Sequence, residues 1–236
     1  MPHLPRHHEH RFPDSLALAS ALSGEIQTDL QEALAVRGVA SLVVSGGNTP
    51  VPLFTRLAAE KLDWAQIWVT LADERWVEPN NELSNERCVR EYLLQGQASV
   101  ARFIALKNPA VVPEAGLEWT WRSLTRLPRP YDVVVLGMGD DGHFASLFPG
   151  SLGISRALDV AASPGCVAMH GLVSPHARIS QNLAALVDAR RIVLHFTGEA
   201  KWNVYQRAKL SGSVTELPIR AVLQQQQTPV DVFWSP

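Results

Sequence analysis

Short apolar runs alternate along the chain with longer segments in which apolar residues recur every three or four positions. The apolar runs have the length of buried strands and lie at residues 39–44, 67–71, 102–106, 131–137, 191–196 and 230–234. The segments with helical spacing lie at residues 14–38, 51–60, 85–94, 117–127 and 199–210. Continuous apolar strands that alternate with helices indicate a mostly parallel sheet covered by helices on both faces.

This pattern predicts an α/β fold with one doubly wound, Rossmann-like sheet. We expect a single domain over residues 14–236, an N-terminal tail or first strand at 1–13, and a small appended element near 150–185. The sequence has no internal repeat and no linker rich in Gly, Ser or Pro. Because ligands bind such sheets beyond the carboxyl ends of the strands, polar loops that follow strands are expected to meet at one rim.

The first such loop is SGGNTP, at residues 45–50. Gly46 and Gly47 let the backbone approach a ligand closely, and Asn48 and Thr49 add short polar side chains. A helix follows directly, and the exposed N–H groups at a helix start favour an anion. The loop therefore predicts a phosphate site, although it lacks the Gly-Lys-Ser/Thr ending of a Walker loop. An ordinary strand-to-helix turn is the alternative.

The second loop, at residues 72–86, reads as a polar loop with a charged Asp-Glu-Arg cluster at its start. Asp73 and Arg75 directly follow a predicted strand, which places them at the ligand-binding rim. Asn85 and Arg87 come one loop-length later, where they are able to brace the first cluster. A solvated group of charges is the alternative interpretation.

The third loop, LGMGDDGHFASLFPG, follows the most apolar strand. Its glycines, among them Gly139 and Gly142, make it flexible enough to fold back over a pocket. Asp140 or Asp141 is placed to set the orientation and tautomer of His143. These features favour a catalytic histidine over a structural one.

Two later cations are candidates for completing a phosphate site. Arg178 stands in ARIS, and Lys201 stands in GEAKW at the start of a predicted helix that follows a strand. A lysine at such a helix start is well placed to reach an anion. Taken separately, each cation is better explained as a surface charge.

Composition narrows the class of ligand. The chain has 236 residues, of which 46% are apolar and 19% charged, with a formal net charge of −2. This balance excludes a broad electrostatic attraction to nucleic acid or anionic membranes, whereas a small phosphorylated substrate needs only a local cationic pocket. The N-terminus lacks the apolar core of a signal peptide, and no run approaches the ~20 apolar residues of a membrane span. We therefore expect a cytoplasmic protein without nucleic-acid or membrane partners.

The N-terminal cluster His7, His8, Glu9 and His10 is a conceivable metal site. Neighbouring side chains on an extended segment point to opposite faces, so they do not converge readily on one ion. We expect a solvated tail or a first strand there, and no metal.

Taken together, the three loops resemble the 6-phosphogluconolactonase family, within the wider glucosamine-6-phosphate isomerase/deaminase superfamily. SGGNTP, DERWVEPNNELSN and LGMGDDGHFASLFPG occur in that family's order and spacing. ARISQNLAALVDAR, GEAKW and LPIRAVL are similar to its later segments, so the resemblance covers residues 14–236. It implies hydrolysis of 6-phospho-D-glucono-1,5-lactone to 6-phosphogluconate, in the oxidative pentose phosphate pathway, without a metal or organic cofactor.

The resemblance also assigns roles to individual residues. It implies a phosphate loop with cationic partners, an Asp-Glu-Arg loop and a catalytic histidine. The matching residues are Gly46, Gly47, Asn48 and Thr49 with Arg178 and Lys201 for phosphate, Asp73 and Arg75 for the second loop, and His143 for catalysis. Phe144 departs from the pattern, because the family usually has a small hydroxyl residue there, and we expect one hydrogen bond beside His143 to be missing.

The chemistry expected from these residues needs no acyl-enzyme. His143 takes a proton from water that attacks C1, and it returns the proton to the ring oxygen as the lactone opens. Arg75 stabilises the developing oxyanion. Asp73 holds either Arg75 or the sugar hydroxyls.

Two alternative functions remain open from the sequence. Glucosamine-6-phosphate deaminases resemble this chain but have a glutamate five residues after the histidine, where Phe148 stands here. A non-catalytic sugar-phosphate sensor usually carries a DNA-binding module, for which 236 residues leave no room outside the expected domain. The sequence does not indicate the oligomeric state, the breadth of lactones accepted or any protein partner.

Overall fold

The computed structural model describes residues 7–170 and 176–236. In that part of the chain the six apolar runs and the polar N-terminal segment 8–11 form a seven-stranded sheet. Every neighbouring pair in this sheet is parallel. Across the sheet the strands are β1 (His8–Arg11), β10 (Val230–Ser235), β9 (Ala189–Thr197), β6 (Tyr131–Leu136), β2 (Ala40–Val44), β3 (Ile67–Leu71) and β5 (Arg102–Ile104). The central strands β2 and β6 are buried along their whole length, as expected when both faces are covered.

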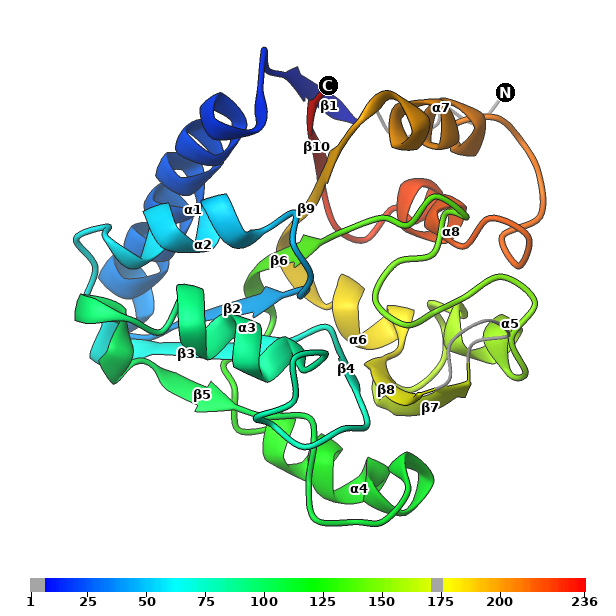
Figure 1. Cartoon of the computed structure of the whole chain (residues 1–236), viewed down its shortest axis with the longest axis horizontal. Coiled ribbons are helices and arrows are strands. Elements are labelled where there is room, and N and C mark those ends of the chain that lie inside the picture. Colours follow the sequence, from blue (N-terminus) through cyan, green and yellow to red (C-terminus); the bar gives the residue numbers. More distant parts are fainter. Residues whose placement is uncertain (1–6, 171–175) are drawn as a thin grey trace.

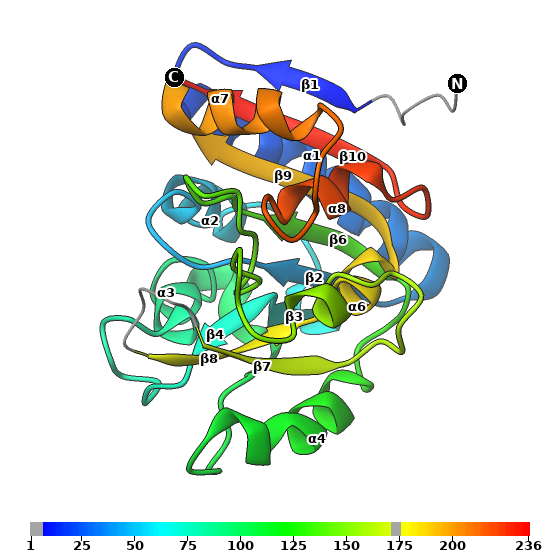
Figure 2. The ribbon, with the colours of Figure 1, turned by 90° about the vertical axis from the view of Figure 1, so that its right-hand side faces the viewer.

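Helices lie on both faces of this sheet, which confirms the doubly wound α/β fold. On one face lie α1 (Ser15–Arg37) and α2 (Val51–Ala58), and on the other lie α7 (Glu199–Ala208) and α8 (Ile219–Gln224) (Figures 1 and 2). The remaining helices are α3 (Asn85–Tyr92), α4 (Pro113–Leu124), α5 (Ile154–Ala157) and α6 (Leu183–Val187), with 3₁₀ turns η1 (Trp64–Gln66) and η2 (Gly96–Val100).

A second, antiparallel sheet forms the appended element. Its strands lie in the order β4 (Asp73–Arg75), β8 (Ala177–Gln181) and β7 (Cys166–His170), and α4 packs against β7 and β8 (Figure 2). Two of the three strands fall within the region 150–185 where a small element was expected. The third, β4, comes from a segment far earlier in the chain.

Two sequence-based boundaries were wrong. The segment 72–86 was predicted to be a polar loop throughout, but its first residues form β4 because their backbone pairs with β8. The helix expected at 117–127 begins four residues earlier, at Pro113, where the fixed φ of proline suits the first turn and its missing N–H costs nothing.

The N-terminal histidines lie at one edge of the large sheet. His8 and His10 belong to β1, which pairs with β10, and the ring of His10 stacks on Phe233 with centroids 4.5 Å apart. No helix within residues 7–170 and 176–236 is both long and apolar enough to cross a membrane.

Candidate active site

A cavity of about 260 Å³ opens beyond the carboxyl ends of β2, β6 and β9. It collects side chains from distant parts of the chain, as the parallel topology predicts. The predicted residues that line it are Gly46, Gly47, Asn48, Thr49, Asp73, Arg75, Gly139, His143, Arg178 and Lys201. Asp141 and Gly142 are not lining residues, and they support the loop behind His143.

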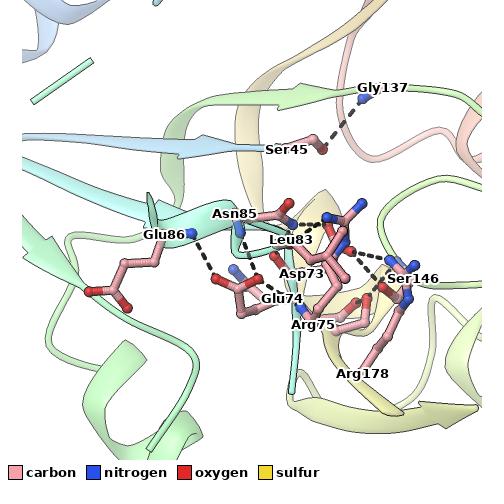
Figure 3. Close-up of polar contacts among 12 residues, drawn as sticks. Ser45, Asp73, Glu74, Arg75, Leu83, Asn85, Glu86, Gly137, Ser146 and Arg178 are labelled. Carbon is pink, nitrogen blue, oxygen red and sulfur yellow. Dashed lines mark hydrogen bonds and ion pairs between the residues drawn. The ribbon is translucent and has the colours of Figure 1, made fainter. Parts of the chain in front are cut away.

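The 45–50 loop is held against its neighbours by specific contacts. The Ser45 N–H donates to the Val135 carbonyl at 3.0 Å, and the Gly137 N–H donates to Ser45 Oγ at 3.4 Å (Figure 3). A Cβ on Gly46 would lie 2.2 Å from Oδ1 of Asn85, so glycine is required here for close packing. Asn85 also donates from Nδ2 to the backbone carbonyl of Asp73 at 2.9 Å. Asn85 therefore joins the 45–50 loop to β4, in the bracing role expected of it.

Arg87, which was expected to brace the same cluster together with Asn85, makes its contacts at another place. Arg87 donates from Nη1 to the Asn80 carbonyl at 3.2 Å and pairs with Glu91 at 3.7 Å. It therefore supports the outer part of the segment after β4. Among the described residues its side chain makes no hydrogen bond or ion pair with Asp73, Glu74 or Arg75. This half of the prediction was wrong.

Glu74 closes the base of that segment. Its carboxyl group accepts hydrogen bonds from the backbone N–H groups of Arg75, Asn85 and Glu86 at 2.7–2.8 Å, and from Ser84 Oγ at 3.1 Å (Figure 3). Burial raises the pKa of Glu74 to about 7, and the three backbone N–H donors oppose that rise. A carboxyl group with 1% exposure thus ties β4 to the start of α3.

We expect Glu74 to make stability depend on pH. The folded protein holds a proton on Glu74 up to about pH 7, whereas the unfolded chain releases it near pH 4.5. The contribution of Glu74 to the free energy of unfolding is therefore complete below pH 4.5. It is lost as the pH rises through 7, and the loss is about 3 kcal/mol at most. Chemical denaturation of the wild type and Glu74→Gln should give a wild-type advantage in unfolding free energy that falls across this window. A difference that stays constant or grows with pH would contradict the prediction.

Asp73 pairs with Arg178, not with Arg75. It is 4% exposed, accepts a hydrogen bond from Ser146 Oγ at 2.5 Å, and has an oxygen 3.9 Å from Nη1 of Arg178 (Figure 3). Arg75 instead donates from Nη1 to the Leu83 carbonyl at 2.5 Å. Among the described residues, Asp73 and Arg75 share no ion pair. Of the two partners expected for Asp73, Arg75 is therefore wrong, and the sugar hydroxyls stay a prediction.

His143 is oriented by Asp141. Its Nδ1 lies 2.5 Å from Oδ1 of Asp141, which also accepts from the His143 backbone N–H at 3.1 Å. Burial raises the pKa of Asp141, but the hydrogen bonds and charge of His143 outweigh that effect and lower it overall. Because Nδ1 is held on the carboxylate, Nε2 is the ring nitrogen left for the cavity. The choice left open between Asp140 and Asp141 is thus decided in favour of Asp141.

The glycines of this loop allow a close contact with the histidine ring and a tight turn. The sequence had suggested that their role was to make the loop flexible. A Cβ on Gly139 would lie 2.2 Å from Nδ1 of His143, so the ring rests directly on the glycine backbone. Gly142 has φ +76°, in the left-handed region that favours glycine. The Gly139 N–H also donates to the His143 carbonyl at 2.9 Å, which closes the turn. The loop is therefore a fixed support for the imidazole.

Phe148 lies between two of the polar groups. Its ring centroid is 4.5 Å from that of His143, and the guanidinium carbon of Arg178 lies 5.1 Å above the same ring. An apolar ring that packs against His143 and Arg178 thus stands at the position where the deaminase pattern has a glutamate.

Lys201 reaches the cavity from the first turn of α7. The helix follows Gly198, whose φ of +94° turns the chain sharply after β9. Within residues 7–170 and 176–236 its ammonium group has no carboxylate partner within 4.0 Å. Its charge is available to an anion in the cavity.

Sequence reasoning missed several lining residues, among them a second histidine. His195 lies near the end of β9, is 4% exposed and borders the cavity. Burial lowers its pKa to about 4, and the charge of Lys201 acts in the same direction. The signal available in the sequence was a polar residue near the end of the apolar run 191–196.

Comparison with known proteins places this geometry in a family. The family described as glucosamine-6-phosphate isomerases/6-phosphogluconolactonase matches residues 13–234. A 6-phosphogluconolactonase of Rhizobium meliloti is 41% identical over 227 residues, covering 96% of this chain and 98% of its own. A crystal structure of a 6-phosphogluconolactonase from Shewanella baltica superposes with a TM-score of 0.95 at 48% identity, covering 99% of both chains.

The chain belongs to the glucosamine-6-phosphate isomerase/6-phosphogluconolactonase family. Its departure from the family pattern at Phe144 is absorbed by the core, because that side chain is fully buried. A hydroxyl group stands two residues later, at Ser146, which is also fully buried and donates to Asp73. Phe144 therefore changes what packs under the His143 loop and leaves the Asp141–His143 pair in place.

Proposed function

We propose that the protein hydrolyses 6-phospho-D-glucono-1,5-lactone to 6-phospho-D-gluconate. The observation that carries this proposal is the joint placement, in one cavity, of an oriented imidazole, two guanidinium groups and a lysine beside a glycine-rich helix start. Relatives named 6-phosphogluconolactonase that match over almost their full length support the same reaction. We treat residues 14–236 as one domain, because both sheets contribute to the cavity.

His143 activates the water in this mechanism. Its Nε2 accepts a proton from water as the oxygen attacks C1 of the lactone. Asp141 keeps the proton on Nδ1 and stabilises the imidazolium that forms, since its carboxylate lies 2.5 Å away. When the C1–O bond breaks, the imidazolium returns its proton to the ring oxygen, which becomes the free hydroxyl of the product.

Arg75 stabilises the negative charge that develops on the carbonyl oxygen. Its side chain is fixed by the Leu83 carbonyl, and it borders the same cavity as His143. A donor that is already positioned costs no reorganisation when the charge forms. Asp73 acts through Arg178, because its carboxylate pairs with that guanidinium and holds it beside the site.

The substrate phosphate lies between the 45–50 loop and Lys201, with Arg178 as the second cation. Binding energy at the phosphate positions C1 without taking part in the bond changes. Because the whole chain has a net charge of −2, this attraction is local to the cavity.

The deciding experiment measures acid release from freshly prepared 6-phosphogluconolactone with and without protein, corrected for spontaneous opening. A protein-dependent rate supports the proposal. Ammonia release from glucosamine 6-phosphate would instead identify a deaminase. Binding of 6-phosphogluconate without any acceleration of lactone opening would identify a sensor.

We expect Lys201→Ala to raise KM for the phosphorylated lactone by about 10- to 100-fold, with a smaller effect on kcat. The lost contact binds a group remote from the reacting carbon, so ground state and transition state weaken together. Steady-state kinetics test this, with the exposed Lys61→Ala as a matched loss of charge outside the cavity. An unchanged KM in Lys201→Ala would remove the lysine from the phosphate site.

A further inference from the structure

A second histidine borders the cavity but takes no part in the mechanism above. His195 is 4% exposed, and its ring makes no hydrogen bond with any residue in the described part of the chain. Because the ring borders the cavity, its hydrogen-bonding nitrogens are left for a group that enters the cavity, and a leucine at this position would offer no such group. We therefore expect His195 to hydrogen-bond a ligand in the cavity.

The neighbours of His195 show which way it points. The ring of Phe196 packs against Tyr205 of α7, with centroids 5.7 Å apart. Successive side chains of a strand point to opposite faces, so His195 points away from α7. Four residues earlier, on the same face as His195, Arg191 binds Glu25 of α1 at 2.5 Å. His195 thus faces the side of the sheet that carries α1 and α2.

That side is also where the 45–50 loop enters α2. The loop, Lys201 and His195 line one cavity, with β6 and β2 following β9 across the sheet. His195 and Lys201 border the same cavity, so one ligand group in that cavity is able to meet both side chains. The imidazole is neutral at pH 7, because burial lowers its pKa to about 4, so it offers one N–H donor and one acceptor.

We propose that His195 is a phosphate-binding residue, whose ring N–H donates a hydrogen bond to a phosphate oxygen held between Lys201 and the 45–50 loop. The inference rests on the phosphorylated ligand of the proposed function. A neutral donor adds a directed hydrogen bond without burying a second positive charge next to Lys201. His195 thereby helps the site to select phosphorylated lactones over unphosphorylated ones.

Calorimetric titration with 6-phosphogluconate tests the proposal on the intact chain. We expect His195→Leu to weaken binding by about 10- to 100-fold. Asn places an amide N–H near the position of Nδ1, and Gln places one near Nε2, so one of His195→Asn and His195→Gln should recover most of the affinity. His10→Leu, the same change in β1 outside the cavity, should bind as the wild type does.

A spectroscopic measurement avoids reliance on variants that fail to fold. In the wild type with ¹⁵N-labelled histidine, inorganic phosphate should shift the ring signals of His195, assigned by their absence from His195→Leu or His195→Gln. Unchanged affinity in a folded His195→Leu, or ring signals that phosphate does not move, would overturn the inference. Phosphate-induced shifts in a protein that fails to open the lactone would support His195 and contradict the proposed function.

Discussion

His143→Ala should lower kcat for lactone hydrolysis by about 10²- to 10⁴-fold while leaving the fold intact. The variant loses the base that accepts the proton of the attacking water. Alanine has no group that Asp141 is able to orient in its place. The remaining rate should come from the bound geometry and from Arg75. Initial rates of acid release, corrected for spontaneous opening, measure the loss.

A matched control exists on the surface. His170 forms a similar pair with Glu114, with Nε2 2.6 Å from Oε1, and it lies outside the cavity. His170→Ala should keep wild-type kcat. If His143→Ala also hydrolyses the lactone at a near-wild-type rate, His143 is not the general base.

Arg75→Ala should lower kcat by about 10²- to 10³-fold, with a smaller change in KM. The Arg75 guanidinium is held by its hydrogen bond to the Leu83 carbonyl. Its Nε is buried and has no hydrogen-bond partner in the described residues. The remaining donors are therefore positioned before the substrate arrives. Such a preset donor acts mainly on the charge of the transition state. Steady-state kinetics separate kcat from KM, and the exposed Arg122→Ala serves as the control for loss of an arginine.

Arg178 is the competing candidate for this role. It lies above Phe148, whose other contact is His143, so it is also close to the reacting groups. If Arg178→Ala lowers kcat by the expected amount and Arg75→Ala raises only KM, the oxyanion donor is Arg178. Similar losses of kcat in both would indicate that the two guanidinium groups share the charge.

The local pattern of the sequence was sufficient to predict the six apolar strands of the large sheet. Strand and helix periods along the chain indicated the parallel sheet, because burial on both faces leaves a continuous apolar run such as 131–136. The parallel topology then brought the polar residues after β2, β6 and β9 to one rim without knowledge of any contact. Loop composition identified His143, Arg75 and Lys201 as lining residues for the same reason.

Contacts between distant segments were decided only by the tertiary structure. The pairing of β4 with β8 brings residues 73–75 beside 178–180. This long-range register sets Asp73 opposite Ser180, two residues from Arg178, whose guanidinium then lies 3.9 Å from the Asp73 carboxylate. Glycine content alone suggested a flexible loop, whereas the structure shows that Gly139 leaves room for the imidazole of His143 to pack on the backbone. His195 was not predicted, because a single polar residue in an apolar strand forms no repeating pattern that sequence analysis can recognise. Periodicity reports which residues are buried, but what a buried polar side chain faces depends on strand order, register and the opposite wall of the cavity.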